Sequence, residues 1–329
     1  MPAGSARTRT RLLTLGWAAA VLAFSGAGAS AGDDPYRWLE RMREAARALT
    51  YEGVFVYRHG GDIETIRVIH RVTEGGEQER LTSLNGARRE VLRDRHRVTC
   101  IFSDNRSVLV DESRGRGLFA SALRQSDDRL RGHYRLSLGG QERVAGRLTR
   151  ELRIDPADEF RYGYRLWLDE QTGLLLKSQL VDERGGTLEE FLFTNINLPE
   201  TIPDTMLEPE VSGEGFDWHT TPDGQASSPA DPSGILVEWV PPGFVKSADS
   251  REPLSGGHQP VQHLVFTDGL AAFSVYLEPV APGKTPFEGL SQMGAMSAFG
   301  ARLGDHHVTV IGEVPRTTVD RVGRSVQRK

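Results

Sequence analysis

The sequence has a single cysteine, Cys100, among 329 residues, so no disulfide can form within one chain. It also lacks an apolar run long enough to cross a bilayer, since Leu12 to Phe24 is well short of the roughly 20 residues that a spanning helix needs. H-E-x-x-H and C-x-x-C motifs are missing as well. These absences argue against a disulfide-stabilised scaffold, a helical membrane protein, a zinc protease of that motif class and a dithiol redox enzyme.

Groups for nucleotide binding or nucleophilic catalysis are equally scarce. Gly283-Lys284-Thr285 is half of a phosphate-binding loop, but Glu278 stands where its first glycine is needed, and Pro286 follows where a helix should begin. Cys100 has Val98 and Ile101 beside it, a setting typical of a small buried apolar residue rather than of an activated thiolate. We predict neither a nucleotide site nor a cysteine nucleophile.

Histidines and carboxylates provide no better candidate for a metal or an acid–base pair. His306-His307 are adjacent, so on a strand they point to opposite faces, and His258 and His263 have no Cys or carboxylate framework around them. The carboxylates of residues 155–159 belong to a D-P-A-D turn, which favours a solvated loop. We therefore predict surface or capping histidines, no metal, no cofactor and no enzymatic activity.

Composition is that of a globular protein large enough for two domains, with 38% hydrophobic and 26% charged residues. Thirty-six glycines and frequent two-residue turn signals favour strands over helices. The formal net charge is −5, and because residues 1–31 hold three arginines and no acidic residue, removing them leaves −8. An acidic chain with scattered arginines argues against nucleic acid as a partner.

The first 31 residues are predicted to be a signal peptide. Arg7, Arg9 and Arg11 precede the short apolar run, and Ala27-Gly28-Ala29 and Ala29-Ser30-Ala31 are both small-x-small cleavage candidates. No cysteine lies near the cleavage site, which argues against a lipid-anchored lipoprotein. We expect export and release of a soluble mature protein.

Residues 32–216 are predicted to form one domain. Pro35 to Leu49 has apolar residues at helical spacing behind a good start signal, and from Tyr51 the period changes to 2. About eleven strands follow, joined by short hairpin turns, with a short helix expected over 120–130. Antiparallel strands with tight connections predict a closed or half-closed barrel.

A smaller α+β domain is predicted at residues 235–329, after a linker at 217–234 that is rich in Pro, Ser, Asp and Gly. Its centre is a hairpin, in which two apolar runs between Val261 and Leu277 flank Thr267-Asp268-Gly269. A helix is expected over Phe287 to Leu303, and another after Val319.

Five segments resemble the RseB/MucB family, whose members are periplasmic regulators of an envelope-stress sigma factor. They are R-Y-x-Y-R-L-W-L-D-x-x-T-G-L-L-L-K-S at 161–178, L-x-E-F-x-F-T at 188–194, W-x-P-x-G-F at 239–244, H-L-V-F-x-D-G-L-A-x-F-S-V-Y-x-E at 263–278 and V-T-V-x-G-E-V-P at 308–315. The resemblance runs from about Asp34 to Ser325. It implies an N-terminal domain like the carriers LolA and LolB, a half-open barrel with a helix over its mouth.

The same resemblance implies a function without catalysis or a cofactor. The protein would bind the periplasmic region of a membrane-spanning anti-sigma factor and shield it from site-1 proteolysis. Lipid, lipopolysaccharide or the acyl chains of mislocalised lipoproteins would favour a state with weaker affinity for that partner. The alternative is a periplasmic lipid or lipoprotein carrier or chaperone, and the sequence leaves homo-oligomerisation open.

Candidate residues follow from this interpretation. A barrel open on one side leaves apolar surface to fill, although period 2 alone does not distinguish a cavity lining from a packed core. The candidates for a lipid cavity are Phe55, Tyr57, Leu118, Phe119, Tyr162, Tyr164, Trp167 and Phe191. Those for an anionic headgroup are Arg114 and Arg116, and those for partner binding are Trp239, Phe244, His263, Phe266 and Tyr276.

Overall fold

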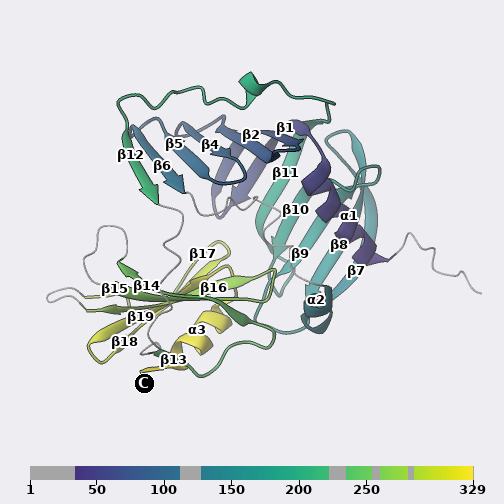
Figure 1. Ribbon diagram of the computed structural model, residues 1–329. Helices are drawn as coiled ribbons and strands as arrows, with labels where there is room; N and C mark the ends of the chain where they lie inside the picture. The colour runs from purple at the N-terminus through teal and green to yellow at the C-terminus, as the bar shows by residue number, and fades with distance from the viewer. Residues whose placement is uncertain (1–33, 112–126, 222–234, 254–259, 281–284, 329) are drawn as a thin grey trace, which may run out of the picture.

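The computed structural model contains a large curved sheet and a smaller, flatter sheet beneath it (Figure 1). No helix of the described residues has both the length and the apolar character that crossing a membrane requires. The structure describes residues 34–111, 127–221, 235–253, 260–280 and 285–328.

Twelve strands form the large sheet in the order β12-β6-β5-β4-β3-β2-β1-β11-β10-β9-β8-β7. Neighbours are antiparallel, except that β12 runs parallel to β6, and the two outermost strands do not pair to close a barrel. The predicted α+β fold with a half-open barrel is thus confirmed. The strands are β1 (Tyr51–His59), β2 (Asp62–Thr73), β3 (Gly76–Ser83), β4 (Arg89–Arg93), β5 (Val98–Phe102), β6 (Ser107–Asp111), β7 (Tyr134–Val144), β8 (Arg147–Pro156), β9 (Gly163–Asp169), β10 (Leu175–Val181), β11 (Thr187–Asn197) and β12 (Asp217–Thr221).

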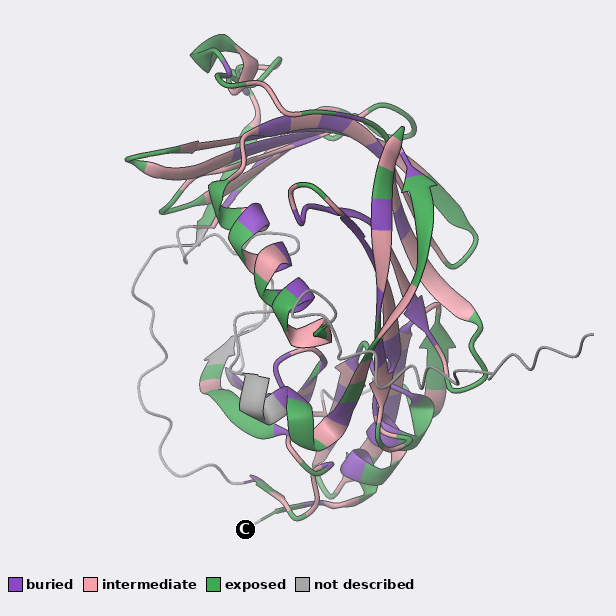
Figure 2. Cartoon of the chain, turned by 90° about the vertical axis from the view of Figure 1, so that its right-hand side faces the viewer, coloured by how far each residue is buried: buried purple, intermediate pink, exposed green. Residues whose placement is uncertain are grey.

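The predicted N-terminal helix is α1 (Pro35–Ala48), which lies against the concave face of the sheet. The Asp34 side chain caps it by accepting from the backbone N–H of Tyr36 at 3.0 Å, and Pro35 occupies the first turn. Figure 2 shows its buried residues on the side that faces the sheet. Leu39 is fully buried and packs with Leu152 of β8 and Leu168 of β9. The short helix α2 (Asp127–His133) contributes to the same cluster.

The second sheet has six antiparallel strands in the order β14-β15-β16-β19-β18-β17. Helix α3 (Arg316–Arg324) covers one face, where Gly323 lies so close to the Phe299 ring that a Cβ would not fit. A separate two-stranded ribbon pairs β13 (Ile235–Val237) with β20 (Val326–Arg328). The strands of the main sheet are β14 (Val245–Pro253), β15 (Pro260–Thr267), β16 (Ala272–Pro279), β17 (Gly289–Met293), β18 (Met296–Leu303) and β19 (His306–Gly312).

Three local predictions differ from the structure. The helix expected over Phe287 to Leu303 is wrong, because β17 and β18 form a hairpin there that turns at Gly294 with φ of 59°. The last helix begins at Arg316 rather than after Val319. Residues 217–221, assigned to the linker by composition, form β12, and its pairing with β6 is a long-range contact that local composition does not encode. A short 3-10 turn, Asp204–Met206, precedes it.

A buried ion pair joins the two domains. Nη1 of Arg161 lies 2.6 Å from Oδ2 of Asp268, and both side chains are 0% exposed. The same oxygen accepts from the Tyr134 hydroxyl at 2.9 Å, while Arg161 also donates to the Pro242 carbonyl at 2.6 Å. Burial, followed by the charge of Asp268, raises the pKa of Tyr134, which keeps it a donor. We call Arg161, Asp268 and Tyr134 the interdomain latch; it places the C-terminal sheet below the concave face.

Candidate binding cavity

A cavity of about 620 Å³ lies between the concave face of the large sheet and the C-terminal domain, within the size range of ligand pockets. Strands β1 to β4 and β8 to β11 supply most of its wall, and Leu270 and Glu313 of the C-terminal domain complete it. Its lining is Phe55, Tyr57, Glu64, Ile66, Leu81, Arg89, Val91, Arg93, Ile154, Tyr164, Leu166, Leu175, Ser178, Leu180, Glu189, Glu190, Phe191, Leu270 and Glu313.

The apolar part of the wall comes from alternate residues of paired strands. Tyr57, Phe191 and Ser178 lie side by side across β1, β11 and β10, so period 2 places them on one face. The ring of Phe55 contacts that of Phe191, with centroids 4.7 Å apart. These rings pack against their neighbours within the sheet, and the curvature of the sheet leaves the space above them open for an apolar ligand.

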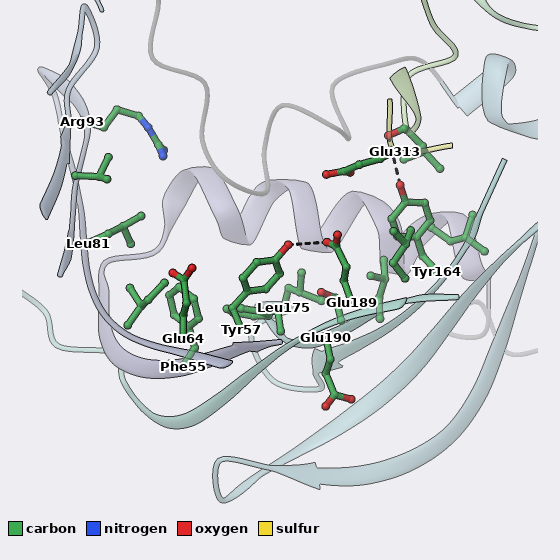
Figure 3. A pocket seen from close by; sticks show the side chains of 18 of the residues that line it. Phe55, Tyr57, Glu64, Leu81, Arg93, Tyr164, Leu175, Glu189, Glu190 and Glu313 are labelled. Carbon is green, nitrogen blue, oxygen red and sulfur yellow. Dashed lines mark hydrogen bonds between the residues drawn. The ribbon is translucent and has the colours of Figure 1, made fainter. Parts of the chain in front are cut away.

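Polar groups lie at defined points of this wall (Figure 3). The Tyr57 hydroxyl donates to Glu189 at 2.6 Å, and the Tyr164 hydroxyl donates to the Leu270 carbonyl at 3.4 Å, across the domain junction. Removal from water, followed by the charge of Glu189, raises the pKa of Glu313. Burial first, and then the hydrogen bond to Glu189, raises the pKa of Tyr57, so this phenol stays protonated.

Four of the eight cavity candidates line the space, namely Phe55, Tyr57, Tyr164 and Phe191. Tyr162 packs instead with Leu180 and Ala295 at the domain contact, and Trp167 lies under the Lys177 ammonium, 4.0 Å from its ring centroid. Leu118 and Phe119, together with the headgroup candidates Arg114 and Arg116, lie outside the described residues.

The sequence interpretation missed the charged lining, above all Glu189 and Glu313. Glu189 sits two residues before Phe191, so the alternation that marks the phenylalanine also places this carboxylate on the cavity face. No such signal exists for Glu313 or Leu270, because they reach the cavity only through the packing of the second domain.

The five partner-binding candidates separate into two groups. Phe244 and Phe266 are buried in the core of the C-terminal domain, and Trp239 packs on Phe160 and Arg321 at the junction. Residues on β15 alternate between faces, so the core position of Phe266 leaves His263 on the other side of the sheet. The His263 ring stacks on Tyr276 with centroids 4.3 Å apart. Both rings lie on the face of the sheet opposite α3, and Figure 1 shows that this face is turned toward the concave side of the large sheet.

Groups considered for catalysis or metal binding have structural partners. Asp158 accepts from Arg161 at 3.0 Å, and His307 contacts the Phe287 carbonyl at 2.6 Å. Burial raises the pKa of Cys100, opposite to the direction that activates a thiol. Within the described ranges, no three His, Cys, Asp or Glu side chains are grouped closely enough to hold a metal ion, and His258 lies outside them.

Fold and cavity together define a class of protein, in which a half-open β-barrel is joined to a smaller β-sheet domain and an apolar cavity lies at their junction. Models of the MucB/RseB N-terminal domain and the MucB/RseB C-terminal domain match residues 34–211 and 229–327. The chain therefore belongs to the MucB/RseB family, and the predicted resemblance is confirmed.

Individual relatives agree along almost the whole chain. The sigma factor AlgU regulatory protein MucB of Pseudomonas aeruginosa is 37% identical over 334 residues, covering 98% of each chain. The sigma-E factor regulatory protein RseB of Escherichia coli is 26% identical over 318 residues, covering 92% of this chain and 93% of that protein. MucB in the Pseudomonas aeruginosa MucA/MucB complex matches with a TM-score of 0.71 and 33% identity, over 90% of this chain and 99% of that chain.

Proposed function

We propose that this protein is a periplasmic negative regulator of an envelope-stress sigma factor. It binds the periplasmic region of a membrane-spanning anti-sigma factor and shields it from site-1 proteolysis. The observation that carries the proposal is the likeness, at a TM-score of 0.71, to a MucB chain solved with MucA bound. A second MucB structure, a complex with MucA(peri), matches at 0.70 and supports the periplasmic location.

The physical basis of shielding is occupancy. A polypeptide segment held against this protein cannot enter a protease cleft at the same time. The structure offers two adjoining surfaces for such a segment, the cavity and the face of the C-terminal sheet that carries His263 and Tyr276. Both are lined by aromatic side chains, which supply much of the binding free energy at protein interfaces.

Replacing Tyr276 with alanine is expected to weaken binding of the partner's periplasmic segment about tenfold, because the side chain supplies a large contact surface. Calorimetric titration of the purified segment measures this affinity. The matched control is Leu148→Ala, which truncates an exposed apolar side chain of β8 that lines no part of the cavity. No binding of the segment by the wild-type protein would refute the proposed function itself.

A second part of the proposal is that an acyl chain competes with the partner. The support is the cavity, whose apolar walls and volume of about 620 Å³ suit a single alkyl chain. If an amphiphile binds the partner-free form more tightly than the partner-bound form, then bound amphiphile lowers the affinity for the partner by the same factor. A carrier of lipids or lipoproteins would use the same space, but a carrier has no need of a latched second domain.

Filling the cavity is expected to abolish this competition. Ser178→Trp places an indole among Phe191 and Leu166, its neighbours across the sheet, and leaves no charge buried. Dodecyl maltoside below its micellar concentration should then no longer weaken partner binding, whereas it does so for the wild type and for the control Gln179→Trp on the opposite face. Competition that persists in Ser178→Trp would place the amphiphile elsewhere, and transfer of lipid to acceptor vesicles would favour the carrier.

A further inference from the structure

Two carboxylates from different domains meet at one end of the cavity. Glu189 extends from β11 of the large sheet, and Glu313 follows β19 of the C-terminal domain. Figure 3 shows both side chains pointing into the same space, with the Tyr57 hydroxyl bonded to the first. Their proximity is also seen in the pKa of Glu313, which burial and the charge of Glu189 both raise.

The remaining charges of the lining are already balanced. Arg89 pairs with Glu64 at 2.6 Å, and Arg93 pairs with Glu79 at 2.6 Å. Glu190 accepts from Gln179, and Figure 3 shows it pointing to the other side of the sheet from Glu189. Within the described part of the chain, no cation pairs with Glu189 or Glu313.

Glu189 is half-buried and Glu313 is exposed, so the cost at this end is mainly the repulsion between two like charges. A cation placed between them relieves that repulsion, while an anion adds to it. The acidic end therefore discriminates between occupants by charge, which the apolar wall alone does not do.

The opposite end of the cavity carries an unused donor. The Arg93 side chain is only 10% exposed, and Figure 3 shows its guanidinium directed into the cavity. An arginine fork carries five N–H donors, and Glu79 accepts from Nη1 alone at 2.6 Å, so this end fits an occupant that brings a carbonyl or carboxylate oxygen.

The cavity thus has apolar walls, one end with a hydrogen-bond donor for an oxygen atom, and one acidic end that attracts a cation. A polypeptide segment carries groups that complement all three. We propose that the cavity binds a segment of the partner protein with a lysine or arginine side chain between Glu189 and Glu313, apolar side chains along the wall, and a backbone or carboxylate oxygen at Arg93. This inference rests on the proposed function and names the part of the partner that the cavity selects.

A double-mutant cycle tests the cation. Each lysine and arginine of the partner's periplasmic segment is replaced in turn by methionine, and each peptide is titrated into wild type, Glu189→Gln/Glu313→Gln and the control Glu200→Gln, an exposed carboxylate outside the lining. One replacement should weaken binding about tenfold or more to wild type and to the control, but only marginally to the double variant. If every replacement costs the same in the double variant as in wild type, the proposal is overturned.

Single-chain amphiphiles provide a test that does not depend on the partner. Dodecylammonium, dodecyl sulfate and dodecyl maltoside share one tail and differ in charge. Wild type and the control Glu200→Gln should bind dodecylammonium about tenfold more tightly than dodecyl sulfate, and Glu189→Gln/Glu313→Gln should lose this preference. Equal or tighter binding of dodecyl sulfate by wild type would overturn the inference, even if the partner segment binds as proposed.

Discussion

Replacing Asp268 with alanine is expected to lower the free energy of unfolding by about 3–5 kcal/mol, the range for breaking a buried ion pair. Its Oδ2 accepts from Arg161 and Tyr134, and its Oδ1 accepts from the backbone N–H groups of Leu270 and Ala271 at 2.9 and 2.8 Å. Alanine leaves the guanidinium of Arg161, whose side chain is 0% exposed, half-paired, and it loosens the hairpin turn that contributes Leu270 to the cavity. Chemical denaturation followed by circular dichroism measures the change.

The control for the latch is Asp320→Ala in α3, which removes the i,i+4 partner, 2.8 Å away, of the exposed Arg324. Pairs of this kind are worth about 0.3–0.5 kcal/mol. A loss for Asp268→Ala no larger than that of the control would mean that the latch contributes nothing to the docking of the two domains. Calorimetric scans that separate two transitions in the variant, but not in wild type, would locate the loss at the junction.

Replacing Phe273 with alanine is expected to destabilise the C-terminal domain by about 3–5 kcal/mol through loss of buried area and formation of a cavity. Phe273 is 2% exposed, and its ring lies 5.2 Å from both Phe244 and Phe266, centroid to centroid. Scanning calorimetry follows the transition of this domain. Partner binding should fall in step with the unfolded fraction, because the side chain itself faces the core.

The matched control is Phe287→Ala, which truncates a side chain that is 46% exposed and should cost less than about 1 kcal/mol. Weaker partner binding by a fully folded Phe273→Ala variant would contradict the assignment of Phe244 and Phe266 to a core. It would return these two residues to the list of contact candidates.

The latch also bears on how an amphiphile displaces the partner. Two domains joined by a linker can in general reorient as rigid bodies. Arg161 and Asp268, both fully buried, hold the junction on one side, and Tyr164 bonds to Leu270 beside the cavity. Because breaking the pair is costly, direct competition within the cavity requires less free energy than rotation of a domain. Affinity measurements on Ser178→Trp and Asp268→Ala separate these two routes.

Local sequence determined several parts of this protein by itself. Asp34 and Pro35 define the start of α1, Asp268-Gly269 defines the turn of the central hairpin, and alternation along β1 and β11 places Phe55, Tyr57 and Phe191 on one face. Caps, turns and period 2 act over a few residues, so one sequence is enough to find them. The resemblance of five segments to the RseB/MucB family indicated the overall fold, since together these segments span both domains.

Only the tertiary structure decided which face of each strand meets a cavity and which meets a core. Phe244 and Phe266 resemble contact residues in sequence but pack beneath α3, and residues 217–221 resemble a linker but pair with β6. Glu189 and Glu313 come together because two domains dock, and no local pattern connects them. Long-range packing selects among arrangements that local preferences leave nearly equal in free energy, and the charge of the cavity is set there.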